Sequence, residues 1–312
     1  MTPPATVSGL LSRNLAPTRR GNCATIDLDL EEHLFLRDHL VGGQPLLSTV
    51  MGIESMACAA ALIAPDRGSP GFRSVTDVAV LPPYFLPTGQ PGRVQVTVLP
   101  DRGSRELRCE LSGPGSDSGW APPTVHFRGT FPDQREVLLR PISESLPAKM
   151  PGGPAAGAEL IYRLFFHGPS FRVVESVHFS AGLMVGVAAL GLPPVVHPHR
   201  RSLMAPLLIE LCLQTAGLWE LAVLGRMMIP HSIERVTRFT AVDLDDGVPL
   251  FALVSPRVDV DGRAIFDARV IDREGQVHLE VTGYRSVEFG HPTDQAAAEP
   301  IRQALSGIPG AI

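Results

Sequence analysis

The sequence is poor in charged and aromatic side chains. Charged residues make up 19% and aromatic residues 6% of the 312 residues, and the formal net charge is −5. Proteins that bind nucleic acid usually carry a basic patch, so this balance argues against such a partner. Hydrophobic residues, at 44%, are still sufficient for a substantial core, and we expect a globular chain rather than a disordered one.

Cysteine is scarce and unclustered. The four cysteines lie far apart, so neither a disulfide framework nor a cysteine metal site is expected. The nearest approach to a metal-ligand pair is His197-x-His199, which is weak, and we expect no metal. The segment Met1–Ala5 lacks the charged lead and apolar run of an export signal. A reducing cytoplasm is therefore the expected compartment.

No uninterrupted membrane span is visible. The longest apolar segment, Leu203 to Ile229, contains four side chains that would be costly in lipid. We therefore expect a buried helix of a soluble protein and no membrane partner. The four side chains are those of Glu210, Gln214, Glu220 and Arg226.

Proline and glycine are abundant, with thirty of each, and indicate many turns and short strands. Two similar halves are expected at 23–140 and 159–290, joined by a linker at 141–158. A lead-in at 1–22 and a polar tail at 291–312 flank them and are expected to be poorly ordered. The residue pattern of each half predicts a loop, one long helix and several strands. The expected fold is α+β, with an antiparallel sheet wrapping a helix, made twice.

The two expected helices are apolar on nearly every side. One spans 49–64 and contains a single charge, Glu54, and the other begins at Pro206. Helices of this kind must be surrounded by other structure. Strands are expected at 25–30, 74–81, 93–99, 106–111 and 124–131 in the first half, and at 171–180, 183–190, 232–242, 249–258, 264–271 and 277–289 in the second.

Two short stretches carry the residues best suited to chemistry. The first, from His39 to Ser48, reads His-Leu-Val-Gly-Gly-Gln-Pro-Leu-Leu-Ser, and the second, from Pro206 to Gln214, reads Pro-Leu-Leu-Ile-Glu-Leu-Cys-Leu-Gln. Together they offer one base and one acid. Such a pair suits proton removal beside a carbonyl and loss of a leaving group.

These stretches resemble motifs of polyketide synthase dehydratase domains. The first is similar to that family's His-x-x-x-Gly-x-x-x-x-Pro motif, with Ser48 in place of proline. The sequence Phe-His-Gly-Pro-Ser-Phe resembles the Tyr-Gly-Pro-x-Phe motif, with His167 at the tyrosine position. The second stretch resembles Pro-x-Leu-Leu-Asp-x-x-x-Gln, with Glu210 in place of aspartate.

The three motifs occur in the family's order, so the resemblance covers residues 24–290. Their wording is closest to dehydratases of iterative enediyne or polyunsaturated fatty acid synthases. The resemblance implies a double hotdog fold with one active site between the halves. It also implies a 3-hydroxyacyl thioester substrate carried on the phosphopantetheine of an acyl carrier protein, with no cofactor bound by the chain itself. The carrier protein and other synthase domains would be partners, and related domains commonly form homodimers.

His39 is the expected general base, because the pKa of an ordinary histidine lies near operating pH. The motif resemblance supports the same role. The alternative is a capped or solvent-exposed loop histidine. By resemblance the Gly43 amide, just before the helix, stabilises negative charge on the thioester oxygen. Gly42 and Gly43 could instead form only a tight turn, and the two roles are compatible. Ser48 removes a rigid turn residue from this loop.

Glu210 is the expected general acid, since a glutamate in an apolar helix is rarely buried without a partner or a function. Burial would raise its pKa and the nearby helix start would lower it, so the sequence is compatible with a shift in either direction. Gln214 lies one turn further on the same face, where it can hydrogen-bond the carboxyl. The alternative is an exposed glutamate on a polar helix edge.

The remaining motif residues are expected to shape the pocket. His167, Gly168 and Pro169 would fix the start of a strand that lines it. Two arginines before the second helix are either solvated or contact the acidic carrier surface and the phosphopantetheine phosphate. The pocket or architectural residues are Ser48, His167, Gly168, Pro169, Phe171 and Pro206, and the carrier-contact candidates are Arg200 and Arg201.

Three functions are compatible with these residues. The leading one is dehydration of a 3-hydroxyacyl carrier-protein thioester to the 2-enoyl thioester. A second keeps the fold and changes the reaction to double-bond isomerisation, cyclisation or thioester hydrolysis, since Ser48 and Glu210 depart from the family pattern. The third is a non-catalytic acyl-binding or scaffold domain.

Overall fold

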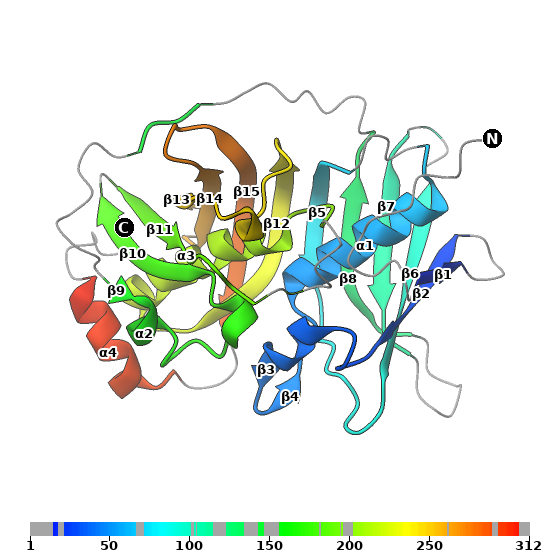
Figure 1. Cartoon of the computed structure of the whole chain (residues 1–312), viewed down its shortest axis with the longest axis horizontal. Coiled ribbons are helices and arrows are strands. Elements are labelled where there is room, and N and C mark those ends of the chain that lie inside the picture. The colour runs from blue at the N-terminus through cyan, green and yellow to red at the C-terminus, as the bar shows by residue number, and fades with distance from the viewer. Residues whose placement is uncertain are drawn as a thin grey trace. The chain divides into compact units, whose positions relative to one another are not determined.

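The structure is a computed structural model of the chain (Figure 1). It forms two compact units. The N-terminal unit comprises Met1–Leu138 and Pro194–Pro206, and the C-terminal unit comprises Leu139–Pro193 and Leu207–Ile312. The residues that the structure describes are 15–17, 22–66, 72–100, 103, 105–114, 123–133, 143–146, 156–180, 182–193, 195, 202–260, 262–288 and 293–305.

The N-terminal unit contains an antiparallel sheet in the order β1-β2-β6-β7-β8-β5. A short hairpin of β3 and β4 lies outside this sheet, in the loop that carries His39. The elements are β1 (Leu15–Pro17), β2 (Cys23–Leu28), η1 (Leu34–Arg37), β3 (Leu40–Val41), β4 (Gln44–Pro45), α1 (Thr49–Ile63), β5 (Ser74–Val80), β6 (Gly92–Pro100), β7 (Leu107–Ser112) and β8 (Val125–Phe131).

Helix α1 packs directly against this sheet (Figure 1). Its residues from Thr49 to Ala60 are all buried, as the apolar sequence predicts. The helix lies so close to β8 that a Cβ at Gly52 would be only 2.9 Å from the Phe127 ring. Any larger residue at this position would force the helix away from the strand.

The C-terminal unit repeats the architecture, with an antiparallel sheet in the order β12-β15-β14-β13-β11-β10-β9. Its elements are β9 (Ala156–Gly157), α2 (Ala158–Ile161), η2 (Pro169–Phe171), β10 (Val174–Ser180), β11 (Leu183–Ala188), α3 (Pro206–Leu224), β12 (Met228–Arg238), η3 (Leu244–Asp246), β13 (Phe251–Val258), β14 (Ala264–Ile271), β15 (Val277–Glu288) and α4 (Gln295–Ala304).

Helix α3 lies on this second sheet (Figure 1). A Cβ at Gly186 in β11 would collide with the Thr215 side chain, and the Trp219 ring meets Phe266 of β14 edge-on with centroids 5.5 Å apart. Within the described part of the chain, α3 is the one helix long and apolar enough to span a membrane, but 78% of its apolar window is buried inside the protein. It is therefore packed as a core helix.

The expected α+β architecture, one long helix on an antiparallel sheet in each half, is confirmed. The ends of the chain differ from expectation. Strand β1 lies in the expected lead-in, and α4 lies in the expected polar tail. Helix α4 forms because the Asp294 carboxylate accepts the N–H groups of Ala296 and Ala297, and because Ile301 is buried.

Three strands of the C-terminal unit begin at other residues than predicted, among them β13, which starts at Phe251 rather than 249. Strand β10 starts at Val174 rather than 171, because the preceding residues form the 3-10 turn η2. Strand β12 starts at Met228 rather than 232 and includes Pro230, which the sheet accommodates with a register shift before Ser232. It ends at Arg238, whose guanidinium donates to the carbonyls of Thr240, Ala241 and Val242 and turns the chain.

The four cysteines are buried thiols that form no disulfide. Burial raises the pKa of the Cys109 and Cys212 thiols, which keeps them protonated and unreactive. They behave as small core residues, in agreement with the composition.

Glu54 anchors the segment that leads into α3. Its side chain is fully buried, and its two carboxylate oxygens accept the N–H groups of Leu203 at 2.7 Å and Met204 at 2.8 Å. The next residue, Ala205, has a φ of +52°, which an L-residue with a Cβ adopts only when its surroundings impose it. The buried carboxylate thus stabilises an unfavourable backbone immediately before the helix.

We expect Glu54→Ala to lower the free energy of unfolding by roughly 3 kcal/mol, because it leaves one buried and one partly buried N–H group without their acceptor. Chemical denaturation measures this loss. Glu288→Ala is the control, since Glu288 pairs with Arg226 on the surface, where both side chains are about 60% exposed. That change should cost less than about 1 kcal/mol. Equal losses in the two variants would contradict the anchoring role.

Candidate active site

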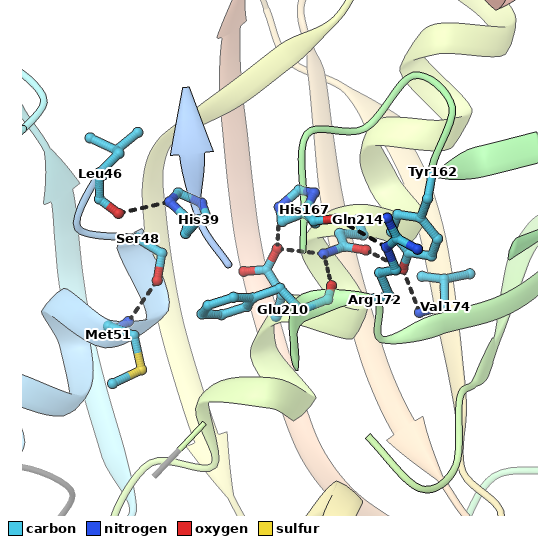
Figure 2. Close-up of polar contacts among 11 residues, drawn as sticks. His39, Leu46, Ser48, Met51, Tyr162, His167, Arg172, Val174, Glu210 and Gln214 are labelled. Atoms are coloured by element: carbon cyan, nitrogen blue, oxygen red, sulfur yellow. Dashed lines mark hydrogen bonds and ion pairs between the residues drawn. The ribbon is translucent and has the colours of Figure 1, made fainter. Parts of the chain in front are cut away.

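His39 lies between η1 and β3, and its side chain is only 6% exposed. Its Nδ1 is 2.8 Å from the carbonyl oxygen of Leu46 (Figure 2). A carbonyl only accepts, so Nδ1 carries the proton and the neutral ring has its lone pair on Nε2. The solvent-exposed alternative for this histidine is therefore wrong, and the ring is held in the tautomer that can accept a proton at Nε2.

Gly42 and Gly43 form the turn of the β3–β4 hairpin. Their φ angles are +59° and +80°, so both are left-handed, as a two-residue type I′ turn requires. Their geometry is therefore that of the tight turn that the sequence analysis offered as an alternative. Gly43 precedes α1, which begins at Thr49 as predicted. A role for the Gly43 amide at the thioester oxygen stays a prediction.

Ser48 is the N-cap of α1. Its buried hydroxyl accepts the N–H of Met51 at 3.4 Å (Figure 2). A capping serine satisfies one of the helix's first N–H groups, so it begins the helix by hydrogen bonding where the family motif has a rigid proline. The loss of proline at this position is therefore compensated locally.

Glu210 projects from the first turns of α3, and its side chain is 8% exposed, so the exposed-edge alternative is wrong. Its Oε1 accepts a hydrogen bond from Gln214 Nε2 at 2.8 Å, as the spacing predicts (Figure 2). The same nitrogen donates to the carbonyl oxygen of Phe171 at 2.8 Å. The carboxyl is thus buried with a fixed donor, as a group that must hold or release a proton requires.

Tyr162 completes this network and was missed by the sequence analysis. Its hydroxyl donates to Gln214 Oε1 at 2.8 Å and accepts the N–H of Val174 at 2.9 Å (Figure 2). Burial raises the Tyr162 pKa, so the hydroxyl stays protonated. The hydrogen bond from the Tyr162 hydroxyl to Gln214 Oε1 orients the amide so that its nitrogen points toward Glu210. No spacing or motif relates Tyr162 to the helix, so no sequence signal could have identified it.

We expect Tyr162→Phe to lower the dehydration rate about tenfold, because the Gln214 amide loses the bond that orients it. Steady-state kinetics with a 3-hydroxyacyl thioester measures the effect. Tyr84→Phe is a matched control. The Tyr84 hydroxyl makes a similar pair of hydrogen bonds, to the carbonyl and N–H of Arg93 in the N-terminal unit. If both variants keep the wild-type rate, Tyr162 has no positioning role.

His167 contacts the expected acid directly, a contact that adds to the pocket or architectural role expected from the sequence. Its Nε2 is 3.2 Å from Glu210 Oε1 (Figure 2). Its ring stacks on that of Phe166 with centroids 4.6 Å apart. Gly168 and Pro169 lie where their expected structural role requires, at the start of the η2 turn before β10. The sequence indicated the importance of His167 but not its partner.

The predicted site residues fall into two groups, one in each unit. Pro206 is the first residue of α3, as expected. The carrier-contact candidates Arg200 and Arg201, together with His197 and His199, lie outside the described residues. Among the described residues, no group of three histidine, cysteine or acidic side chains could hold a metal ion. The first group contains His39, Gly43 and Ser48, and the second contains His167, Gly168, Pro169, Phe171, Glu210 and Gln214.

A second carboxyl on α3, Glu220, is also buried. Burial raises the pKa of Glu220 to about 7, an effect only partly offset by the hydrogen bond donated by the Ser286 hydroxyl. Burial raises the pKa of Tyr284, and the nearby Glu220 and Glu210 carboxyls raise it further. The sequence marked Glu220 only as a polar group in an apolar segment.

The raised pKa makes stability depend on pH. Between the ordinary value of 4.5 and about 7, the folded state holds a proton on Glu220 that the unfolded state has lost. Stability therefore falls as pH rises through this window. We expect Glu220→Gln to be more stable than wild type above pH 7, on the order of 3 kcal/mol, and equal to it near pH 4.5. Thermal unfolding across this range measures it, and parallel pH profiles would contradict the assignment.

Two family models match the chain. One, described as "Polyketide synthase dehydratase N-terminal domain", matches residues 153–296, and the other, "Polyketide synthase dehydratase domain", matches residues 9–112. Together they cover most of the sequence, so the chain belongs to the polyketide synthase dehydratase family. The resemblance of its motifs to that family is confirmed. No curated protein sequence matches the chain.

Solved structures of the same family share the fold. The dehydratase domain of the CurJ module of curacin polyketide synthase aligns with a TM-score of 0.71 at 17% identity, covering 91% of this chain and 98% of that one. The dehydratase domain of a mycocerosic acid synthase-like polyketide synthase gives 0.67 at 19% identity, with coverages of 90% and 95%. A trans-AT dehydratase domain from Brevibacillus brevis gives 0.68 at 17%, with coverages of 87% and 96%. The expected double hotdog fold is confirmed.

Proposed function

We propose that this dehydratase removes water from a 3-hydroxyacyl thioester carried on an acyl carrier protein and forms the 2-enoyl thioester. The family establishes the class of reaction as a dehydration in polyketide biosynthesis. The observation that supports the residue assignment is the buried Glu210 carboxyl, whose Oε1 accepts the hydrogen bond from Gln214. Such a group can deliver a proton to a departing hydroxyl.

In the proposed reaction His39 and Glu210 act on one acyl chain. Nε2 of His39 takes the C2 proton, and the electrons of that bond form the new C2–C3 double bond. The bond between C3 and its hydroxyl breaks, and the hydroxyl leaves as water with the proton from Glu210. Negative charge on the thioester oxygen is stabilised by a backbone N–H group, for which Gly43 is the candidate. The elimination uses no cofactor of the chain's own.

The substrate carrier is also part of the proposal. The phosphopantetheine phosphate and the acidic carrier surface would meet a basic loop, and Arg200 and Arg201 are the candidates for that contact. Other synthase domains are the further partners, and the domain is proposed to act as a homodimer in the cytoplasm.

We expect His39→Ala and Glu210→Gln each to lower the dehydration rate at least a hundredfold, because each removes a proton-transfer group. The assay incubates the enzyme with a 3-hydroxyacyl carrier protein and follows loss of the mass of one water. His231→Ala, at an exposed histidine in β12, is the control and should keep the wild-type rate. Unchanged circular dichroism and Tm show that the variants fold.

The same assay separates the competing functions. Release of free carrier protein indicates thioester hydrolysis, and an unchanged substrate mass despite clear binding indicates a scaffold. Full activity of either site variant would contradict the assigned roles of His39 and Glu210.

A further inference from the structure

Two of the three departures from the family's motifs contact each other. His167 stands at the position of the motif's tyrosine and Glu210 at that of its aspartate. In the structure His167 Nε2 lies 3.2 Å from Glu210 Oε1, and both side chains are at most 10% exposed (Figure 2). The contact between these two buried side chains indicates that they act together.

We propose that His167 is a positioning residue for the acid of this dehydratase, and that His167 and Glu210 act as a unit. This inference rests on the proposed function, in which Glu210 gives its proton to the departing hydroxyl. His167 directs that proton to one carboxyl oxygen and stabilises the carboxylate that remains.

The hydrogen bonds on Glu210 define which oxygen holds the proton. Oε1 accepts from Gln214 Nε2 at 2.8 Å, and His167 Nε2 approaches the same oxygen. An oxygen with two donors is a poor site for a proton, so the proton of the neutral acid is on Oε2. After proton transfer the same two donors stabilise the negative charge, because hydrogen bonds to a charged acceptor are stronger than those to a neutral one.

The His167 ring is held in this orientation by its neighbours. It stacks on Phe166 at an interplanar angle of 16° and lies 6.4 Å from the Phe171 ring. Its backbone carbonyl accepts a hydrogen bond from Arg172 Nε at 3.2 Å, and the Arg172 guanidinium in turn lies over the Tyr162 ring. The imidazole is therefore placed before substrate arrives, as a preorganised donor must be.

The sizes of the two residues make their contact depend on both. Glutamate is longer than aspartate by one methylene, and histidine reaches less far from the backbone than tyrosine. In this structure a long acid meets a short donor at 3.2 Å. A single reversion to the family residue would crowd the pair or separate it.

The first test removes the donor and the ring separately. His167→Phe keeps an aromatic ring on Phe166 but has no donor, whereas His167→Gln loses the ring and keeps an N–H donor of similar reach. We expect kcat to fall about tenfold in His167→Phe with KM within about twofold of wild type, and His167→Gln to recover most of kcat. Equal loss in both variants, or a change in KM alone, would overturn the inference.

The second test is a double-mutant cycle with His167→Tyr, Glu210→Asp and the combined variant. Each single change should lower kcat about tenfold, and the combination should return it to within about threefold of wild type. If the wild type is active and the combined variant loses kcat by the product of the two single losses, the pairing is overturned.

Unfolding temperatures of the four proteins in this cycle separate failure of the pairing from failure of the proposed function. If the wild type does not dehydrate the substrate, the proposed function fails. A combined Tm shift smaller than the sum of the single shifts still supports the pairing in that case, and additive shifts overturn it.

Discussion

A carboxyl group inside an apolar helix must be given partners, and this constraint determines much of the structure. Each long helix contains such groups, and each is treated differently. The Glu54 carboxylate accepts two backbone N–H groups and anchors the chain before α3. Glu210 is contacted by Gln214 and His167, and Glu220 has a single hydroxyl donor and a raised pKa. Burial with a single donor favours the protonated acid at Glu220, whereas the two backbone donors at Glu54 favour a fixed structural carboxylate.

The acid of the proposed site is positioned by successive hydrogen bonds rather than by one residue. The backbone N–H of Val174 binds the Tyr162 hydroxyl, which binds the Gln214 amide, which binds the Glu210 carboxyl. The path connects the start of strand β10 to helix α3 through the interior of one unit. A sheet that holds the strand in register therefore also fixes the orientation of the acid.

Much of the fold could be predicted because it depends on local patterns. The apolar runs that became α1 and α3, and the alternation that became strands such as β14, are visible without any tertiary information. The errors occur where a distant contact overrides the local pattern. Strand β12 continues through Pro230 because β15 pairs with it across a register shift, and it ends where Arg238 binds three downstream carbonyls. Neither effect has a signature in the residues of the strand itself.

The sequence by itself determined the family, the two-part architecture and the identity of the candidate base and acid, because these depend on residue types at fixed spacings. It also indicated the Gln214–Glu210 bond, since residues one turn apart share a helix face. Only the tertiary structure decided that Tyr162 orients Gln214, that Glu54 binds the segment before α3, and that His167 contacts Glu210. Those contacts join residues far apart in the chain, and their distances follow from how the helices pack on the sheets.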